Sequence, residues 1–314
     1  HKWDYYFGFV GQADYYRPVI TEGIKGTYTP AKLYQGEYVD TILTRKAVEW
    51  LQQDHDKPIC MFLWFYAPHA PFYRPKDMGN DLNGVPIPVP TSFHEDLKDY
   101  PGKPRAVADA DNKIGYSEVF SDDPRSLEEL VKDHYMGVED NDRNIGAVLK
   151  VLEKQNKLKD SAILLTSDHG FFLGEHHFYD KRLMYEPSIR IPMIIRYPGR
   201  VRPGATSDEM VLNLDLAPTM LEVAGLPVPS DMQGRSILPL AEGKFVKDWR
   251  KDWLYEFYEY PGFENVRPCR GVRTERYKLI HYFIEPEEWE LYDLKTDPNE
   301  MDNLYGKTGY EEPT

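Results

Sequence analysis

The chain has 314 residues, of which 29% are charged and 41% are hydrophobic, and its formal net charge is −14. This length can bury a sizeable core in roughly two domains, or in one large α/β domain with an appendage. The acidic balance argues against nucleic acid as the main partner, because phosphate binding needs a basic surface. No stretch of 18 or more apolar residues occurs, so the sequence predicts no membrane span.

The first third of the chain alternates irregular and regular patterns. Residues 1–35 are rich in aromatics, Gly and Pro without a clear period, and we expect a loop there. Residues 37–53 carry apolar side chains at three- and four-residue steps, which predicts a helix. The apolar run 59–66 is short and is followed by Pro, which predicts a strand buried on both faces.

A long segment then precedes the best helix signal of the sequence. Residues 67–127 are rich in Pro, Gly and Asp, and long loops in compact enzymes usually lie near a functional site. Ser126 followed by Glu129 has the spacing of a capping box. We therefore predict a helix that starts at about 127 and runs to about 155.

Two further apolar runs predict buried strands at 161–167 and 191–196, and 213–224 predicts a helix with Pro218 near its start. Strands and helices alternate with suitable gaps, so we predict an α/β fold with a mostly parallel sheet flanked by helices. This main domain would occupy residues 1–245.

The pattern changes after about residue 245. Short strand signals separated by turns predict an antiparallel sheet, and we expect a small C-terminal subdomain over 246–314. The predicted strands are 253–258, 271–274, 277–283 and 290–294.

The two cysteines form no disulfide framework. Cys60 lies inside the apolar run 59–66, so we expect a buried structural thiol. Cys269 follows Arg267-Pro268, at the start of a predicted strand, and we expect it to be inert as well.

An acidic residue and a histidine stand directly after the predicted strand 161–167. In open α/β sheets ligands bind at the carboxyl ends of strands. Asp168 offers a hard oxygen ligand and His169 an imidazole nitrogen, and both can hold a divalent cation. The spacing alone fits equally well a second reading, in which Asp168 caps the following helix.

The segment that follows concentrates charge. Glu175, His176, His177, Lys181 and Arg182 lie within nine residues after a candidate metal ligand. Charge runs are usually solvated faces, but a Lys at this sheet edge could hold an anionic group as a point charge.

Taken together, several segments resemble the sulfatase family of the alkaline-phosphatase-like superfamily. The central ones are Ser167-Asp168-His169-Gly170, Leu173-Gly174-Glu175-His176, Asp180-Lys181-Arg182 and Pro192-Met193-Ile194-Ile195. Others in the same order are Pro68-His69-Ala70-Pro71, Asn213 to Thr219, Met232 to Ser236, Arg270 to Ile280 and Glu290 to Leu294.

The resemblance implies a role for each matching residue. Asp168 would be a calcium ligand, and His169 would be a second ligand or contact the substrate oxygen. Lys181 and His69 would contact the sulfate, and His69 could instead protonate the leaving group. For His177 and Arg182 the family offers no secure role, and they would line the substrate pocket or belong to the scaffold, as would His176.

The family's nucleophile is a formylglycine made in a Cys/Ser-x-Pro/Ala-Ser-Arg segment, which none of the 314 residues provides. We therefore expect this chain to start after that segment, to lack the first strands of the fold and to have negligible activity alone. The family implies calcium and formylglycine as cofactors.

The resemblance predicts sulfate ester hydrolysis, with sulfated glycans such as N-acetylglucosamine-6-sulfate as substrates. The alternatives are a phosphonate monoester or phosphodiester hydrolase of the same superfamily and a non-catalytic sulfatase-like binding protein. The family also implies a periplasmic or secreted bacterial protein, and the sequence contains no Asn-x-Ser/Thr acceptor for glycosylation.

Overall fold

The computed structural model describes residues 3–79, 82–95, 97, 102–114, 123–262 and 264–310. The chain divides into two compact units. Unit 1 comprises residues 1–88 and 124–159, and unit 2 comprises residues 89–123 and 160–314. Residues 1–2 of the predicted N-terminal loop and residues 311–314 of the predicted C-terminal subdomain lie outside the described residues.

Unit 1 begins with a small antiparallel sheet. Its strands are β1 (Tyr5–Gly8), β2 (Val19–Ile24), β3 (Thr27–Tyr28) and β4 (Lys32–Leu33), with β2 pairing all three others. The prediction of a loop over 1–35 was therefore wrong. The strands are short and carry turn residues between them, and their pairing partners become visible only in three dimensions.

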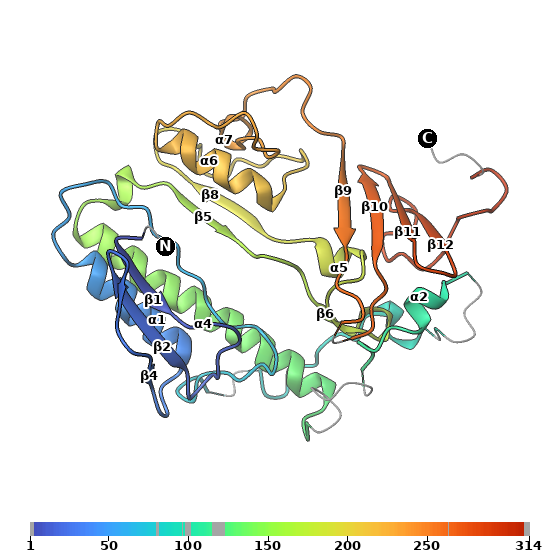
Figure 1. Ribbon diagram of the computed structural model, residues 1–314, viewed down its shortest axis with the longest axis horizontal. Coiled ribbons are helices and arrows are strands. Elements are labelled where there is room, and N and C mark those ends of the chain that lie inside the picture. The colour runs from blue at the N-terminus through green and yellow to red at the C-terminus, as the bar shows by residue number, and fades with distance from the viewer. Residues whose placement is uncertain are drawn as a thin grey trace. The chain divides into compact units, whose positions relative to one another are not determined.

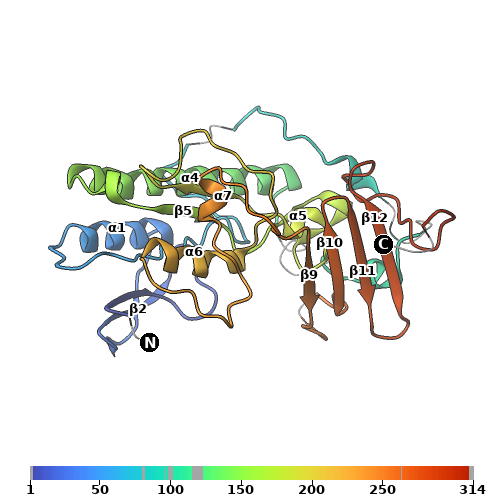
Figure 2. The ribbon, with the colours of Figure 1, turned by 90° about the horizontal axis from the view of Figure 1, so that it is seen from above.

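Two helices complete unit 1 and run side by side in both views (Figures 1 and 2). Helix α1 (Val39–Leu51) buries the apolar face that its sequence period predicts. Helix α4 (Leu127–Lys154) starts with the predicted capping box, because Ser126 Oγ accepts from Glu129 N while Glu129 Oε2 accepts from Ser126 N. Both helix predictions are confirmed to within a few residues.

The segment 59–66 is extended but forms no strand in the described part of the chain, so the prediction of a buried strand was wrong. Exposed and half-buried side chains alternate along it, and the Trp64 side chain is 71% exposed. Cys60 is exposed as well, which corrects the expectation of a buried thiol. A short apolar run signals burial only where the fold supplies a neighbour on each side.

Unit 2 holds two short elements before its sheets, η1 (Thr91–His94) and α2 (Arg105–Ala108). Its largest sheet is antiparallel, with strand order β12-β11-β10-β9, and Figure 2 shows the four strands in this order. The strands are β9 (Asp252–Phe257), β10 (Cys269–Thr274), β11 (Tyr277–Tyr282) and β12 (Glu288–Asp293). The predicted C-terminal antiparallel sheet is confirmed.

The two strands that flank the candidate site in sequence do not follow the predicted parallel arrangement. Strand β5 (Ile163–Thr166) pairs antiparallel with β8 (Met193–Arg196), from Ile163 opposite Arg196 to Thr166 opposite Met193. Their connection holds a hairpin and a single-turn helix instead of a long crossover helix, so the chain returns in the opposite direction. No parallel pair occurs among the described strands.

The remaining elements of unit 2 complete the list. They are η2 (Leu158–Asp160) at the boundary between the units, β6 (Phe172–Leu173), η3 (Glu175–His177), β7 (Tyr179–Asp180), α5 (Glu186–Ile189), η4 (Asn213–Asp215), α6 (Leu216–Val223) and α7 (Leu238–Ala241). The helix predicted at 213–224 is confirmed as η4 followed by α6. One hydrophobic core contains residues of the four-stranded sheet and of the segment Phe172–Tyr185. The sheet therefore packs against the charged segment that contains Lys181 and Arg182.

Candidate active site

Asp168 and His169 lie directly after β5 and face each other. His169 Nε2 lies 3.4 Å from Asp168 Oδ2, and His169 Nδ1 is bound to the Gly170 carbonyl at 2.7 Å. A carbonyl oxygen can only accept, so Nδ1 is the donor in this bond and the Nε2 edge of the ring faces the carboxylate. The Asp168 side chain is 82% exposed and the His169 side chain is 34% exposed.

Gly170, the residue after this pair, packs directly against helix α5. Its N–H donates to the Ser188 carbonyl at 2.8 Å, and a Cβ at this position would lie 2.1 Å from the Pro187 carbonyl oxygen. Only a residue without a side chain allows so close an approach. The predicted reading of Asp168 as a helix cap fails here, since no helix begins at this residue.

A hairpin returns the chain to the same region. Strand β6 pairs antiparallel with β7, and Phe172 lies opposite Asp180. Lys181 and Arg182 follow directly, and both contact Asp180: Lys181 Nζ lies 2.8 Å from Oδ1, and Arg182 Nη1 lies 2.6 Å from Oδ2. Asp180 thus holds both cations at the end of the hairpin strand that pairs with β6.

The turn of this hairpin and the end of β7 contain strained backbone conformations. Positive φ angles occur at His176 (54°), His177 (61°), Asp180 (68°) and Arg182 (86°), and none of these residues is glycine. Such conformations cost about 1–3 kcal/mol each and persist where the surroundings over-determine them, as they often do at functional sites.

His176 anchors the strained turn in the core. Its ring is 2% exposed, and Nδ1 lies 2.5 Å from Glu95 Oε2, while its backbone N–H donates to Ser92 Oγ at 3.0 Å. It also stacks on the Tyr185 ring at 4.8 Å. These contacts fit a scaffold role for His176, and the residue also lines the cavity of unit 2.

The His177 side chain has different contacts from those of His176. Its Nδ1 lies 3.3 Å from the Phe93 carbonyl, and the two rings are 5.1 Å apart. The ring is half-buried beside the turn, in line with scaffold or pocket lining.

His69 belongs to unit 1, whereas the other predicted site residues belong to unit 2. Its backbone is well fixed, because Tyr15 donates a hydroxyl hydrogen bond to the His69 carbonyl at 2.5 Å. Upstream, Asp40 accepts hydrogen bonds from the backbone N–H groups of Tyr66 (2.7 Å) and Ala67 (2.8 Å). The His69 ring stacks on Tyr66 at 5.3 Å, with its Nδ1 2.7 Å from the Ala70 carbonyl.

The Asp168–His169 pair fits part of a metal site. One carboxylate and one imidazole nitrogen are adjacent, and the second ring nitrogen is fixed by a carbonyl, as is typical of metal-bound histidines. Among the described residues no group of three His, Cys, Asp or Glu side chains could hold a metal ion. Calcium takes six to eight oxygen ligands, so this pair supplies only a fraction of a coordination sphere.

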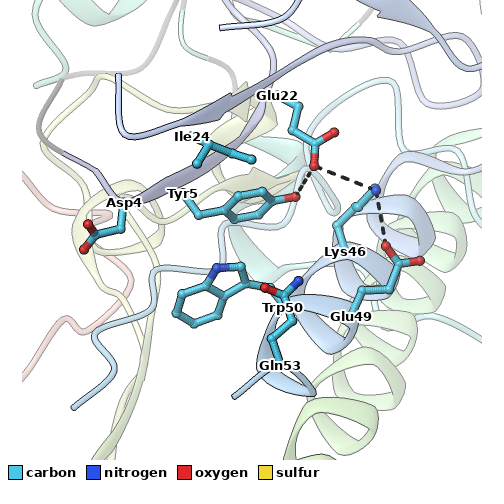
Figure 3. Close-up of a pocket in the computed structure, with 8 residues that line it drawn as sticks. All are labelled: Asp4, Tyr5, Glu22, Ile24, Lys46, Glu49, Trp50 and Gln53. Carbon is cyan, nitrogen blue, oxygen red and sulfur yellow. Dashed lines mark hydrogen bonds and ion pairs between the residues drawn. The ribbon is translucent and has the colours of Figure 1, made fainter. Parts of the chain in front are cut away.

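Each unit contains a cavity among its described residues. The cavity in unit 2 has a volume of about 350 Å³, and its lining includes Phe171, Glu175, His176 and Arg190 but neither Asp168 nor His169. The cavity in unit 1, of about 200 Å³, lies between β1, β2 and α1 beside Tyr5 and Trp50 and contains none of the predicted residues (Figure 3).

Several groups that shape the site escaped prediction. Asn112 is fully buried and donates from Nδ2 to the carbonyls of Tyr179 (3.1 Å) and Lys181 (3.3 Å), which fixes β7. Glu264 contacts Arg182 from the segment between β9 and β10. Neither lies in a recognisable motif, so no local sequence signal points to them.

Family models match the chain over nearly its whole length. A model described as Sulfatase matches residues 1–226, and one described as N-sulphoglucosamine sulphohydrolase, C-terminal, matches residues 174–314.

Individual relatives agree with these matches. An N-acetylglucosamine-6-O-sulfatase of Bacteroides thetaiotaomicron is 34% identical over 366 residues, covering 98% of this chain and 64% of the relative. The solved structure of BT4656 in complex with its substrate D-glucosamine-2-N,6-O-disulfate has a TM-score of 0.87 at 33% identity and covers 98% of this chain and 73% of that one. A phosphonate monoester hydrolase of Agrobacterium radiobacter, at 23% identity and a TM-score of 0.70 over 86% of this chain and 57% of that one, shares the fold alone.

The fold and the family matches place the chain in the alkaline-phosphatase-like superfamily. Within that superfamily, the chain belongs to the sulfatase family. It spans 64% of the length of its N-acetylglucosamine-6-O-sulfatase relative. No described helix is long and apolar enough to cross a membrane.

Proposed function

We propose that the protein to which this chain belongs is a sulfuric ester hydrolase that removes sulfate from glycans, with 6-O-sulfated N-acetylglucosamine as the substrate class. The observation that carries the proposal is the accessible Asp168–His169 pair at the end of β5, with Lys181 and Arg182 on the returning hairpin. The 34% identity to an N-acetylglucosamine-6-O-sulfatase supports the substrate class.

In this proposal the acidic and the basic residues of the site have different roles. The Asp168 carboxylate would be one oxygen ligand of a calcium ion, which when bound would supply positive charge for the sulfate. His169 would be a second ligand or would contact the substrate oxygen. Lys181 and Arg182 bind the anionic substrate. Both are already paired with Asp180, so a sulfate must compete with this carboxylate for Lys181.

The proposal also keeps His69, whose role is the one implied by the family resemblance of the segment Pro68-His69-Ala70-Pro71. Its role in the proposal is to bind the sulfate or to hold the proton that the departing sugar oxygen receives. The formylglycine belongs to the proposal too. Its segment does not occur in the 314 residues, so activity must be assayed on protein of the relatives' full length, and we predict negligible sulfate release by this chain alone. We further propose that the protein is bacterial and exported, to the periplasm or outside the cell.

The test is sulfate release from N-acetylglucosamine-6-sulfate by the full-length protein, with and without a chelator. Asp168→Asn and Lys181→Ala should each lower kcat/KM by roughly a hundredfold or more, the scale for losing one charged group that stabilises the reaction. Asp231→Asn, an exposed carboxylate on another loop, is the matched control and should behave as the unaltered protein.

The same assay separates the rival functions. Faster turnover of an aryl phosphonate monoester or phosphodiester than of any sulfate ester would replace the sulfatase proposal with the phosphonate hydrolase reading. Binding of the sulfated sugar without turnover of any ester would support a non-catalytic binding protein.

A further inference from the structure

Arg182 is held by the C-terminal half of the chain as well as by its own hairpin. Its Nη1 lies 2.6 Å from Asp180 Oδ2 and 2.5 Å from Glu264 Oε2, and its backbone carbonyl accepts a hydrogen bond from the Tyr255 hydroxyl at 2.8 Å. Glu264 is itself 2% exposed. A residue at a φ of 86° needs such outside support, because that conformation is unfavourable for a side chain such as arginine.

The two carboxyl groups that bind Arg182 are not fully hydrogen-bonded within the described part of the chain. Asp180 Oδ1 and Glu264 Oε1 are both buried, and within the described part of the chain neither takes part in a hydrogen bond of good geometry, although Lys181 Nζ forms an ion pair with Asp180 Oδ1. Asp180 Oδ2 and Glu264 Oε2 contact the same nitrogen of Arg182, so the two carboxyl groups lie next to each other. Two ionised carboxylates cannot hydrogen-bond each other, since both are acceptors only.

One proton resolves this conflict. A protonated Glu264 donates to Asp180, continues to accept from Arg182 through Oε2, and removes one of two adjacent buried negative charges. Without that proton, Glu264 Oε1 stays buried with no hydrogen-bond partner among the described residues, which is unfavourable.

We propose that Glu264 is a positioning residue of the site, which as a neutral acid bonds Asp180 and Arg182 and thereby fixes the two cations Lys181 and Arg182 for an anionic substrate. The inference rests on the proposed function only in taking those cations as the substrate-binding groups.

The electrostatics of the cluster agree with this assignment. Burial first, and then the hydrogen bond and charge of Asp180, raise the pKa of Glu264 well above its ordinary value, against the opposing effect of Arg182 and Lys181. The pKa of Asp180 moves the other way: burial raises it, but the hydrogen bond with Glu264 and the charge of Lys181 outweigh burial and lower it.

The protonation state sets the charge that a substrate meets. With Glu264 neutral, Lys181 and Arg182 outnumber Asp180, and the buried cluster carries one net positive charge. Loss of the Glu264 proton cancels that charge. The remaining carboxylate nearby, Glu259, lies 3.8 Å from Arg182 Nε but is 63% exposed, so solvent screens it.

Three variants of the full-length protein test the proposal. Glu264→Gln keeps the neutral shape, an acceptor for Arg182 and a donor for Asp180, and should retain most of the kcat/KM for sulfate release near neutral pH. Glu264→Ala removes both bonds and should lower kcat/KM by roughly tenfold to a hundredfold, the usual scale for a lost orienting partner. Glu259→Gln is the matched control and should leave kcat/KM unchanged.

The pH profile distinguishes positioning from mere packing. The unaltered enzyme should lose kcat/KM at alkaline pH as Glu264 ionises, whereas Glu264→Gln should retain its rate further into the alkaline range. Superimposable profiles, or a loss in Glu264→Gln equal to that in Glu264→Ala, would overturn the proposal.

A second readout does not depend on activity. The infrared difference spectrum between the unaltered protein and Glu264→Gln, taken near neutral pH, should contain a carboxylic-acid band that disappears when the pH is raised. If the protein releases no sulfate, the proposed function fails while this band still supports the neutral acid. A spectrum showing only an ionised carboxylate at Glu264 refutes the proposal whatever the activity.

Discussion

His176 Nδ1 and Glu95 Oε2 lie 2.5 Å apart in the interior of unit 2, where the His176 ring is 2% exposed and the Glu95 side chain is fully buried. Lys103 lies 3.8 Å from the other Glu95 oxygen and is equally buried. A histidine in the middle of a charged, motif-rich segment thus serves as an anchor that ties the strained turn to the core.

Breaking this anchor should destabilise the protein. Removing one partner of a buried pair leaves an uncompensated charge, so Glu95→Ala should lower the free energy of unfolding by about 3–5 kcal/mol. Arg45→Ala, which removes an ion pair with Glu37 in which both side chains are exposed, should cost less than about 1 kcal/mol. Urea denaturation of both variants decides the matter, and equal losses would show that the Glu95 cluster is not a buried pair in solution.

Gly170 should tolerate no side chain. In Gly170→Ala the new Cβ would lie 2.1 Å from the Pro187 carbonyl oxygen, so α5 or the Asp168–His169 pair must move. We expect a loss of about 1–3 kcal/mol, the usual range for overpacking, together with reduced sulfate release by the full-length protein.

Gly146 supplies the control for that experiment. It lies in α4 with open space around its Cβ position, so Gly146→Ala should stabilise the protein by about 0.5–1 kcal/mol. Thermal melts of both variants test the pair of expectations. A Gly170→Ala protein that melts at or above the unaltered temperature contradicts the packing described for this loop.

Asp40 should make stability fall as pH rises. Burial raises its pKa to about 7, against the lowering effect of the two backbone N–H donors. Between the ordinary aspartate pKa and about 7 the folded state binds the proton that the unfolded state releases, so ionisation opposes folding and the free energy of unfolding decreases across this window. The decrease should amount to a few kcal/mol in order of magnitude and level off above pH 7.

Urea midpoints measured at intervals from about pH 4 to pH 8 give this dependence. In Asp40→Asn the corresponding part of the slope should disappear, although the amide loses one acceptor for the N–H groups of Tyr66 and Ala67 and the variant is less stable at low pH. An unchanged slope in the variant would assign the pH dependence to other groups.

The two cysteines should differ sharply in reactivity. Cys60 is exposed, whereas Cys269 is fully buried and its pKa is raised to about 12, chiefly by burial. Since the thiolate is the reactive species, an alkylating reagent at mild pH should label Cys60 in the native protein and Cys269 only after unfolding. Peptide mapping by mass spectrometry identifies the labelled residue, and rapid native labelling of Cys269 would disprove its burial.

The amino-acid sequence alone determined the local features of this protein. The α1 and α4 periods, the Ser126–Glu129 capping box and the strand signals of the C-terminal sheet depend on neighbours a few residues apart, and such patterns express side-chain spacing directly. The ordered motifs around Asp168, His169 and Lys181 likewise identified the family without any coordinates.

Only the tertiary structure decided how those pieces pair. The direction of β5 against β8 depends on a connection whose course no local pattern reveals, and the exposure of Cys60 depends on which neighbours lie beside residues 59–66. The partners of His176 and Arg182, namely Glu95 and Glu264, lie 81 and 82 residues away in sequence. A buried charge must find a counter-charge somewhere in the fold, but the sequence does not specify which of its 52 carboxylates provides it.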